Sequence, residues 1–170
     1  SSTTPGVTIT TDGLDFLRLI SGSASAALLL LSGRLLVTGD ENLALQVGGV
    51  FKVPGSTDVA VNPAALDAVE VAGIIAKAKD SYLRDVMRGG FREVILVEIF
   101  RRFPDYIDTS KAKNLRLDIG FKIAGEGDDV DRFLVELDKG ACTVTRDGEG
   151  KRTATIALGG VEFLKLATGN

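Results

Sequence analysis

The side chains that most often perform acid–base and nucleophilic chemistry are scarce in this sequence. It contains no histidine, which excludes Ser-His-Asp and Cys-His catalysis and removes the commonest metal ligand. Its one cysteine, Cys142, lies in a stretch predicted to be a strand, which is typical of a buried structural thiol. A single cysteine also excludes an intrachain disulfide and argues against a zinc site.

Two segments have a superficial likeness to ligand-binding loops. The acids Glu126, Asp128, Asp129 and Asp131 cluster, but their spacing departs from Asp-x-Asp-x-Asp-Gly, so we interpret them as a solvated turn. Residues 148–151 (GEGK) lack the spacing of a phosphate loop and precede a predicted strand, not a helix. Catalysis by paired carboxylates stays an alternative, because 23 acids always offer pairs. We expect no enzymatic activity, no metal and no cofactor.

The composition favours an apolar interior. Hydrophobic residues make up 45% of the chain and the net charge is −3, so no basic surface for nucleic acid is expected. The longest apolar run, residues 26–31, is far shorter than the roughly 20 residues of a membrane span. The many apolar residues must therefore line a core, a cavity or a protein interface. Because no basic segment precedes an apolar run at the N-terminus, we expect a cytoplasmic location.

The front of the chain reads as alternating short strands and helices. Residues 1–53 predict a strand and a short helix (7–22), an apolar helix (26–31), a strand (34–38) and an amphipathic helix (41–51). Residues 54–90 have the composition of a linker followed by a bridging helix. That helix is expected to begin at Asn62-Pro63 and to end at Arg88, before Gly89-Gly90.

The back of the chain, residues 91–170, predicts a helix followed by a meander. Apolar residues at helical spacing run from Phe91 to Phe103, and Pro104 ends the helix. From Leu115 onward the apolar period becomes two, which indicates a half-buried strand. Three further strands separated by close turns suggest an antiparallel meander, and a last helix follows. The predicted class is therefore α+β, with an antiparallel sheet of about five strands covered by helices.

One strand–helix unit occurs twice. Residues 7–22 (VTITTDGLDFLRLISG) align without a gap with residues 154–169 (ATIALGGVEFLKLATG). Acid, base and the final glycine are kept together with the apolar positions, as in Asp15/Glu162 and Arg18/Lys165. The glycine is typical of a helix C-terminus, where φ is positive. We interpret the two segments as one structural unit present twice.

Several of these segments resemble the sterol carrier protein type 2 family. Residues 91–105 (FREVILVEIFRRFPD) are similar to its opening helix, and residues 118–123, 133–144 and 153–169 to its sheet and following helix. Residues 26–40 (AALLLLSGRLLVTGD) and 43–51 look like its last elements, although the chain has Val50-Phe51 where the family has Leu-Phe. The family's second half thus stands at the front, as residues 1–53, and its first half at the back.

Three arrangements are compatible with this permuted order. The halves fold on each other within one chain, as a circular permutant bridged by residues 59–88; or they pair between two chains as a swapped homodimer; or the chain is part of a tandem array.

The resemblance implies a non-enzymatic lipid binder with a tunnel between sheet and helices. The expected ligand is a sterol, a fatty acid or acyl-CoA, or a phospholipid, collected by transient contact with a membrane surface. The alternative is a structural module whose apolar face is buried in a dimer or a larger complex. Candidate lining residues, any of which could instead be plain core, are Phe16, Leu19, Leu29, Leu45, Ile99, Phe103, Phe121, Phe133, Val135, Phe163 and Leu166.

Overall fold

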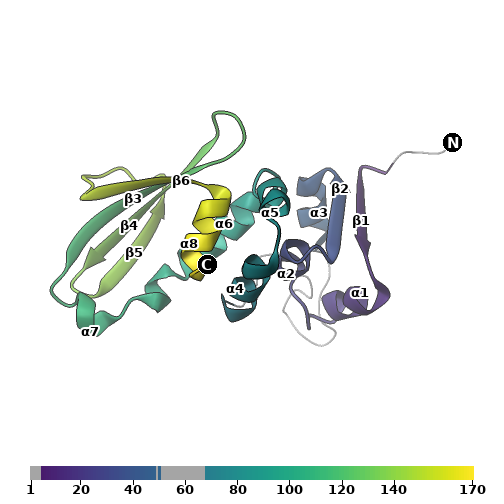
Figure 1. Cartoon of the computed structure of the whole chain (residues 1–170), viewed down its shortest axis with the longest axis horizontal. Helices are drawn as coiled ribbons and strands as arrows, with labels where there is room; N and C mark the ends of the chain where they lie inside the picture. Colours follow the sequence, from purple (N-terminus) through teal and green to yellow (C-terminus); the bar gives the residue numbers. More distant parts are fainter. Residues whose placement is uncertain (1–4, 49, 51–67) are drawn as a thin grey trace. The chain divides into compact units, whose positions relative to one another are not determined.

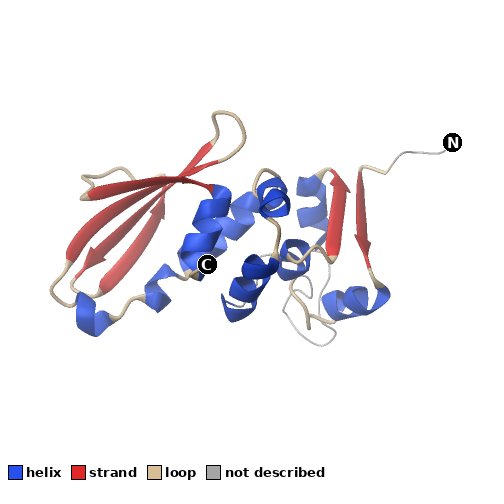
Figure 2. Ribbon diagram, viewed as in Figure 1, coloured by secondary structure: helices blue, strands red, loops and turns tan. Residues whose placement is uncertain are grey.

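The computed structural model describes residues 5–48, 50 and 68–170, which form two compact units (Figure 1). Unit 1 comprises Ser1–Ile95 with Thr168–Asn170, and unit 2 comprises Leu96–Ala167. Each unit combines helices with strands (Figure 2), which confirms the α+β class.

Unit 1 consists of a two-stranded sheet with helices packed around it. The strands pair antiparallel, with Val7 opposite Gly39 and Thr11 opposite Leu35. The described elements are β1 (Val7–Thr11), α1 (Gly13–Ile20), α2 (Ala26–Leu31), β2 (Leu35–Gly39), α3 (Glu41–Gly48), α4 (Ala68–Lys77) and α5 (Asp80–Val86).

Polar caps fix where these short helices begin. The Asp12 carboxylate accepts a hydrogen bond from the Asp15 N–H at 2.7 Å, and the Ser25 hydroxyl accepts one from Leu28 N–H at the start of α2. Such caps satisfy N–H groups that have no partner inside the helix. All six residues of α2 are buried, and α2 contacts α4 and α5. The Tyr82 hydroxyl of α5 donates to the Leu30 carbonyl of α2. The apolar helix α2 is thus the centre of unit 1.

The prediction of one bridging helix up to Arg88 is wrong. Helix α4 ends at Lys77 and α5 begins at Asp80. Between them Lys79 has φ −71° and ψ 137°, an extended conformation that interrupts the helix. Asp80 then lies in the first turn of α5, where a negative charge is favourable. The predicted helix start, Asn62-Pro63, lies outside the described residues.

Unit 2 is a sheet covered by helices. Helix α6 (Phe91–Arg101) crosses the boundary between the units and leads into it. The remaining elements are η1 (Phe103–Tyr106), α7 (Thr109–Ala112), β3 (Arg116–Ala124), β4 (Val130–Asp138), β5 (Ala141–Arg146), β6 (Ala154–Gly159) and α8 (Gly160–Thr168).

The prediction of an antiparallel meander is wrong for the last strand. The strand order is β5-β4-β3-β6, and β6 runs parallel to β3, with Phe121 opposite Ile156. The loop after β5 therefore crosses the sheet instead of turning back. Positions 148 and 150 carry no side chain and lie against Leu134 of β4, while the Arg152 side chain lies over Gly120 of β3. The loop covers Leu134, which is buried although it lies on the sheet face opposite Phe133.

The expected sheet of about five strands is also wrong within one chain. Unit 2 has a mixed sheet of four strands, and β1 and β2 form a separate sheet of two. Among the described strands, those from the front of the sequence pair with each other and those from the back pair with each other. The circular permutation expected from the sequence is therefore not shown by the single chain.

Candidate functional site

Unit 1 encloses an apolar pocket between its sheet and the helices α1 and α3. Its volume is about 250 Å³, slightly below the roughly 300–1,000 Å³ of pockets that hold drug-sized ligands. The pocket is lined by Ile9, Thr11, Phe16, Leu19, Ile20, Ala26, Leu35, Val37, Ala44, Leu45, Val47, Gly48 and Phe91.

The register of β1 and β2 explains why the sheet presents an apolar face to the pocket. Ile9 lies opposite Val37, and Thr11 lies opposite Leu35. Successive side chains of a strand point to opposite faces. These four odd-numbered residues therefore share the face that lines the pocket, whereas Thr8, Thr10, Leu36 and Thr38 are exposed on the other face.

Among the described residues, the pocket wall offers no free polar anchor. Thr11 is the one lining residue with a polar side chain, and its hydroxyl donates to the Arg34 carbonyl at 2.9 Å. A ligand in this pocket would be held by apolar contact alone, without a hydrogen bond or an ion pair.

A polar hollow lies against another face of α1. Its lining includes Arg18, Ser23, Ser25 and Ser32, together with the buried carboxylate of Asp15. The Nε and Nη2 atoms of Arg34 both donate to this carboxylate. The neighbouring Asp12 has its pKa lowered, chiefly by the hydrogen bond from the Asp15 backbone N–H. Asp15 thus pairs with Arg34 and Arg18 outside the apolar pocket.

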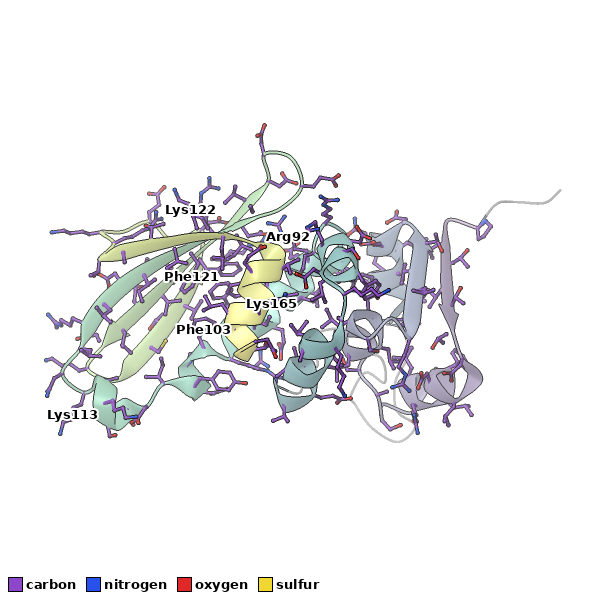
Figure 3. The ribbon with its side chains drawn as sticks, viewed as in Figure 1. Arg92, Phe103, Lys113, Phe121, Lys122 and Lys165 are labelled. Carbon is purple, nitrogen blue, oxygen red and sulfur yellow. The ribbon has the colours of Figure 1, made fainter. Side chains whose placement is uncertain are left out.

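In unit 2 the aromatic side chains fill the space between the sheet and α8. The Phe100 ring stacks on Phe133 with 3.9 Å between centroids and on Phe163 with 4.9 Å. Phe103 and Phe121 meet edge to face at 5.8 Å (Figure 3). Such pairs stabilise a core beyond the area they bury.

A second hollow, of about 320 Å³, opens at one end of this aromatic cluster. It is more open to solvent than a core cavity, because Tyr106 and Leu166 on its rim are exposed. Its lining consists of Phe103, Tyr106, Ile107, Phe121, Phe163, Leu166 and Ala167.

The candidate lining residues are distributed over separate places in the two units. Phe16, Leu19 and Leu45 line the pocket of unit 1. Leu29 lines the polar hollow beside Arg34. Phe103, Phe121, Phe163 and Leu166 line the hollow of unit 2. Ile99, Phe133 and Val135 line none of these three.

Sequence reasoning missed most of the pocket wall. Ile9, Leu35 and Val37 could have been found from the alternation within the two strands that the sequence predicts. Phe91 carried no such signal, because it opens the helix assigned to the other half of the chain. In the structure it is buried and lines the pocket of unit 1.

Neither the single thiol nor the acidic side chains of the described residues form a reactive or metal-binding site. Cys142 is half-buried in β5, and burial raises the pKa of its thiol. Among the described residues no group of three or more His, Cys, Asp or Glu side chains could hold a metal ion. No helix in the described part of the chain is long and apolar enough to cross a membrane.

The comparisons with known proteins bear on the part of the chain that forms this pocket. Residues 1–52 match the SCP-2 sterol transfer family. The match covers under a third of the 170 residues but includes every lining residue of the pocket except Phe91. Comparison with curated proteins found no match, and comparison with solved structures found none either.

Proposed function

We propose that this chain is a non-catalytic lipid binder whose unit 1 pocket accepts an apolar chain. The observation that carries the proposal is the composition of the pocket wall. Its described side chains are apolar except Thr11, whose hydroxyl already donates a hydrogen bond to the Arg34 carbonyl. The SCP-2 match over residues 1–52 supports the same function. The ligand classes are those of the family: a sterol, a fatty acid or acyl-CoA, or a phospholipid.

Apolar burial is sufficient to hold such a ligand. Each methylene group that leaves water contributes about 0.8 kcal/mol. Eight methylenes would contribute about 6 kcal/mol, from which the entropic cost of association has to be subtracted. The pocket volume of about 250 Å³ suits part of an acyl chain better than a whole phospholipid. The headgroup would remain outside.

Phe16 lies at the entrance to the proposed site. It lines the pocket, yet 49% of its surface is exposed. An aromatic side chain that faces both the pocket and solvent can rotate away from the entrance without unfolding its helix. It would also provide the apolar surface for a transient contact with a membrane from which the lipid is taken.

The hollow of unit 2 is a second, smaller part of the proposal. Phe103, Phe121, Phe163 and Leu166 line it, and Ile99, Phe133 and Val135 would support the packed side of the same region. Four of these seven, Phe103, Phe121, Phe133 and Phe163, make ring contacts with Phe100. We therefore expect weaker binding here than in unit 1.

Filling the pocket tests the function. Ala44 is buried and lines the pocket, so Ala44→Leu replaces ligand space by protein. Losing contact with about two methylenes should weaken binding of a pyrene-labelled long-chain fatty acid to delipidated protein about tenfold. Ala167→Leu is the matched control, since Ala167 is exposed and lines the other hollow. Ala167→Leu should leave fatty-acid binding in the pocket of unit 1 unchanged.

Two results would count against lipid binding. The first is delipidated protein that takes up neither the fatty acid nor a fluorescent phospholipid. The second is equal affinity for the Ala44→Leu variant and the unaltered chain, with circular dichroism showing both folded. Val37→Phe fills the pocket from the opposite wall and serves if Ala44→Leu fails to fold.

A further inference from the structure

The two copies of the repeated strand–helix unit are buried on opposite faces. In α1 the side chains of Leu14, Phe16 and Leu17 are exposed. Their counterparts in α8 are Val161, Phe163 and Leu164, and all three are buried, Phe163 completely. Unit 2 therefore covers a face of this helix that unit 1 leaves open.

Two other positions of the repeated helix are buried in α1 and exposed in α8. Leu19 of α1 is 7% exposed and packs with Ala26, Leu29 and Leu35. Its counterpart in α8, Leu166, is 58% exposed. Asp15 is likewise fully buried beneath Arg34, whereas its counterpart Glu162 is exposed. Unit 1 covers the face of the helix that unit 2 leaves open.

In β1, the peptide groups that face β2 belong to the even-numbered residues. The Asp40 N–H donates to the Gly6 carbonyl just beyond the paired strands. Alternation along an antiparallel pair then makes Thr8 and Thr10 the residues of β1 that bond to β2.

In β6, the corresponding peptide groups face an open edge. Leu115 and Gly125 bond to the β4 side, so the even-numbered residues of β3 face β6. In a parallel pair a residue bonds to the two neighbours of its partner. Gly120, opposite Thr155, therefore uses Ala154 and Ile156. Thr155 and Ala157, the counterparts of Thr8 and Thr10, are left facing the open edge.

We propose that residues 26–39 (α2, the loop after it and β2) of a second copy of this chain dock on β6 and α8, reproducing the way they cover β1 and α1. The docked β2 would run antiparallel to β6, with Thr38 opposite Thr155 and Leu36 opposite Ala157. The four-stranded sheet of unit 2 gains a fifth strand. Leu166 enters the cluster of Ala26, Leu29 and Leu35, and Arg34 pairs with Glu162.

The chain itself shows what covers this face, because the same strand–helix unit is seen covered in unit 1. The second copy is favoured as the source, since among the described strands β2 pairs with β1 and β6 pairs with β3 alone. The exchange removes the segment from β1 and α1 and gives it contacts of the same kind on β6 and α8, which is why swapped dimers form at low cost. The β6–α8 unit is moreover held in place by β3 and the aromatic cluster, so it is ordered before docking.

Two variants test the docking through the oligomeric state of the full chain. Ala157→Pro removes an N–H group from the open edge, and Leu166→Lys places a charge where the docked segment would bury it. The full chain should sediment as a dimer, and each variant should dimerise at least tenfold more weakly. Tyr106→Lys is the matched control: Tyr106 is exposed and lines the same hollow as Leu166 but lies off the repeated unit, so it should stay dimeric.

A cross-link tests the register directly. With Cys142→Ser removing the native thiol, Val37→Cys and Ile156→Cys would occupy a non-hydrogen-bonded pair of the docked strands, about 4.5 Å apart at Cα. Oxidation should yield a covalent dimer on a non-reducing gel. The pair Ile9→Cys with Val37→Cys reports the undocked β1–β2 arrangement and should cross-link less efficiently in the dimer.

Two outcomes would overturn the docking. One is a monomer at tens of micromolar without any 37–156 cross-link, and the other is a 37–156 cross-link confined to the monomer. A monomer that still binds fatty acid would leave the proposed function standing. The docked segment takes Leu35 and Val37 away from β1, so only the undocked chain keeps the pocket of unit 1. A dimeric chain whose monomeric Leu166→Lys variant binds no lipid would therefore uphold the docking and count against the proposed function.

Discussion

The fully buried carboxylate of Asp15 accepts hydrogen bonds from both Nε and Nη2 of Arg34. This pair joins the first turn of α1 to the residue that precedes β2. It therefore fixes the position of α1 against the strand whose Leu35 and Val37 line the apolar pocket. The polar contact lies outside the pocket and holds its wall together.

Removing the Arg34 side chain should destabilise unit 1. Arg34→Ala leaves the Asp15 carboxylate buried without its bidentate partner, and breaking a buried pair typically costs about 3–5 kcal/mol. Because the Arg34 side chain is 49% exposed, we expect about 2–3 kcal/mol. Urea unfolding at neutral pH, monitored by a tryptophan at position 16, measures the loss. Arg18→Ala is the control: its contact with Asp15 is 3.4 Å long, and the loss should stay below about 1 kcal/mol. Equal losses would show that Arg34 does not hold Asp15.

Two glycines of unit 1 should respond oppositely to alanine. Gly39, at the end of β2, has φ +99°, and a Cβ there would lie 2.5 Å from the Gly6 carbonyl oxygen. Gly39→Ala should therefore destabilise unit 1 by about 2 kcal/mol or more. Gly13, the first residue of α1, has open space around its Cα. Gly13→Ala should be neutral or stabilise by up to about 1 kcal/mol. The same unfolding assay distinguishes the two, and a tolerated Gly39→Ala would contradict the close approach of β2 to Gly6.

Acid should weaken unit 2 through Glu98. Burial raises the pKa of this carboxyl, but hydrogen bonds and charge from Arg101 and Arg102, at 2.7–2.9 Å, outweigh burial and lower the pKa below 4.5. The stabilisation is therefore complete above pH 4.5 and is lost as the pH falls through the lower, folded value. Unfolding followed by circular dichroism should show that Glu98→Gln is less stable at neutral pH and loses less stability on acidification. Glu136→Gln, which removes an exposed carboxyl of β4, is the control for the loss of one charge and should be as stable as the unaltered chain at neutral pH.

Much of the secondary structure could be predicted, because the signals are local. The period of two beyond Leu115 predicts β3. The predicted helix from Phe91 to Phe103 is present but ends two residues early, at Arg101, and Pro104 lies in the short helix η1 that follows. The parallel position of β6 could not be predicted. It depends on a loop crossing the sheet over Leu134 and Gly120, and the turn residues of that loop equally suit a hairpin.

The candidate site was predictable to the extent that it follows helix periodicity. Phe16, Leu19 and Leu45 belong to amphipathic helices and do line the pocket. The prediction of one tunnel shared by both halves required long-range pairing that composition and period do not encode. Sequence patterns also do not distinguish an apolar residue of a core from one that lines a pocket. For this reason three predicted lining residues, Ile99, Phe133 and Val135, line none of the three hollows described.

Lipid binding by the pocket of unit 1 is tested most directly by a tryptophan placed in its entrance. The chain contains no tryptophan, so Phe16→Trp places a single tryptophan at a lining residue. A bromine-labelled long-chain fatty acid quenches only an indole that it touches. Saturable quenching of Trp at position 16, with none for Val69→Trp on the exposed side of α4, is the predicted result. Equal quenching of both variants, or of neither, would contradict the account.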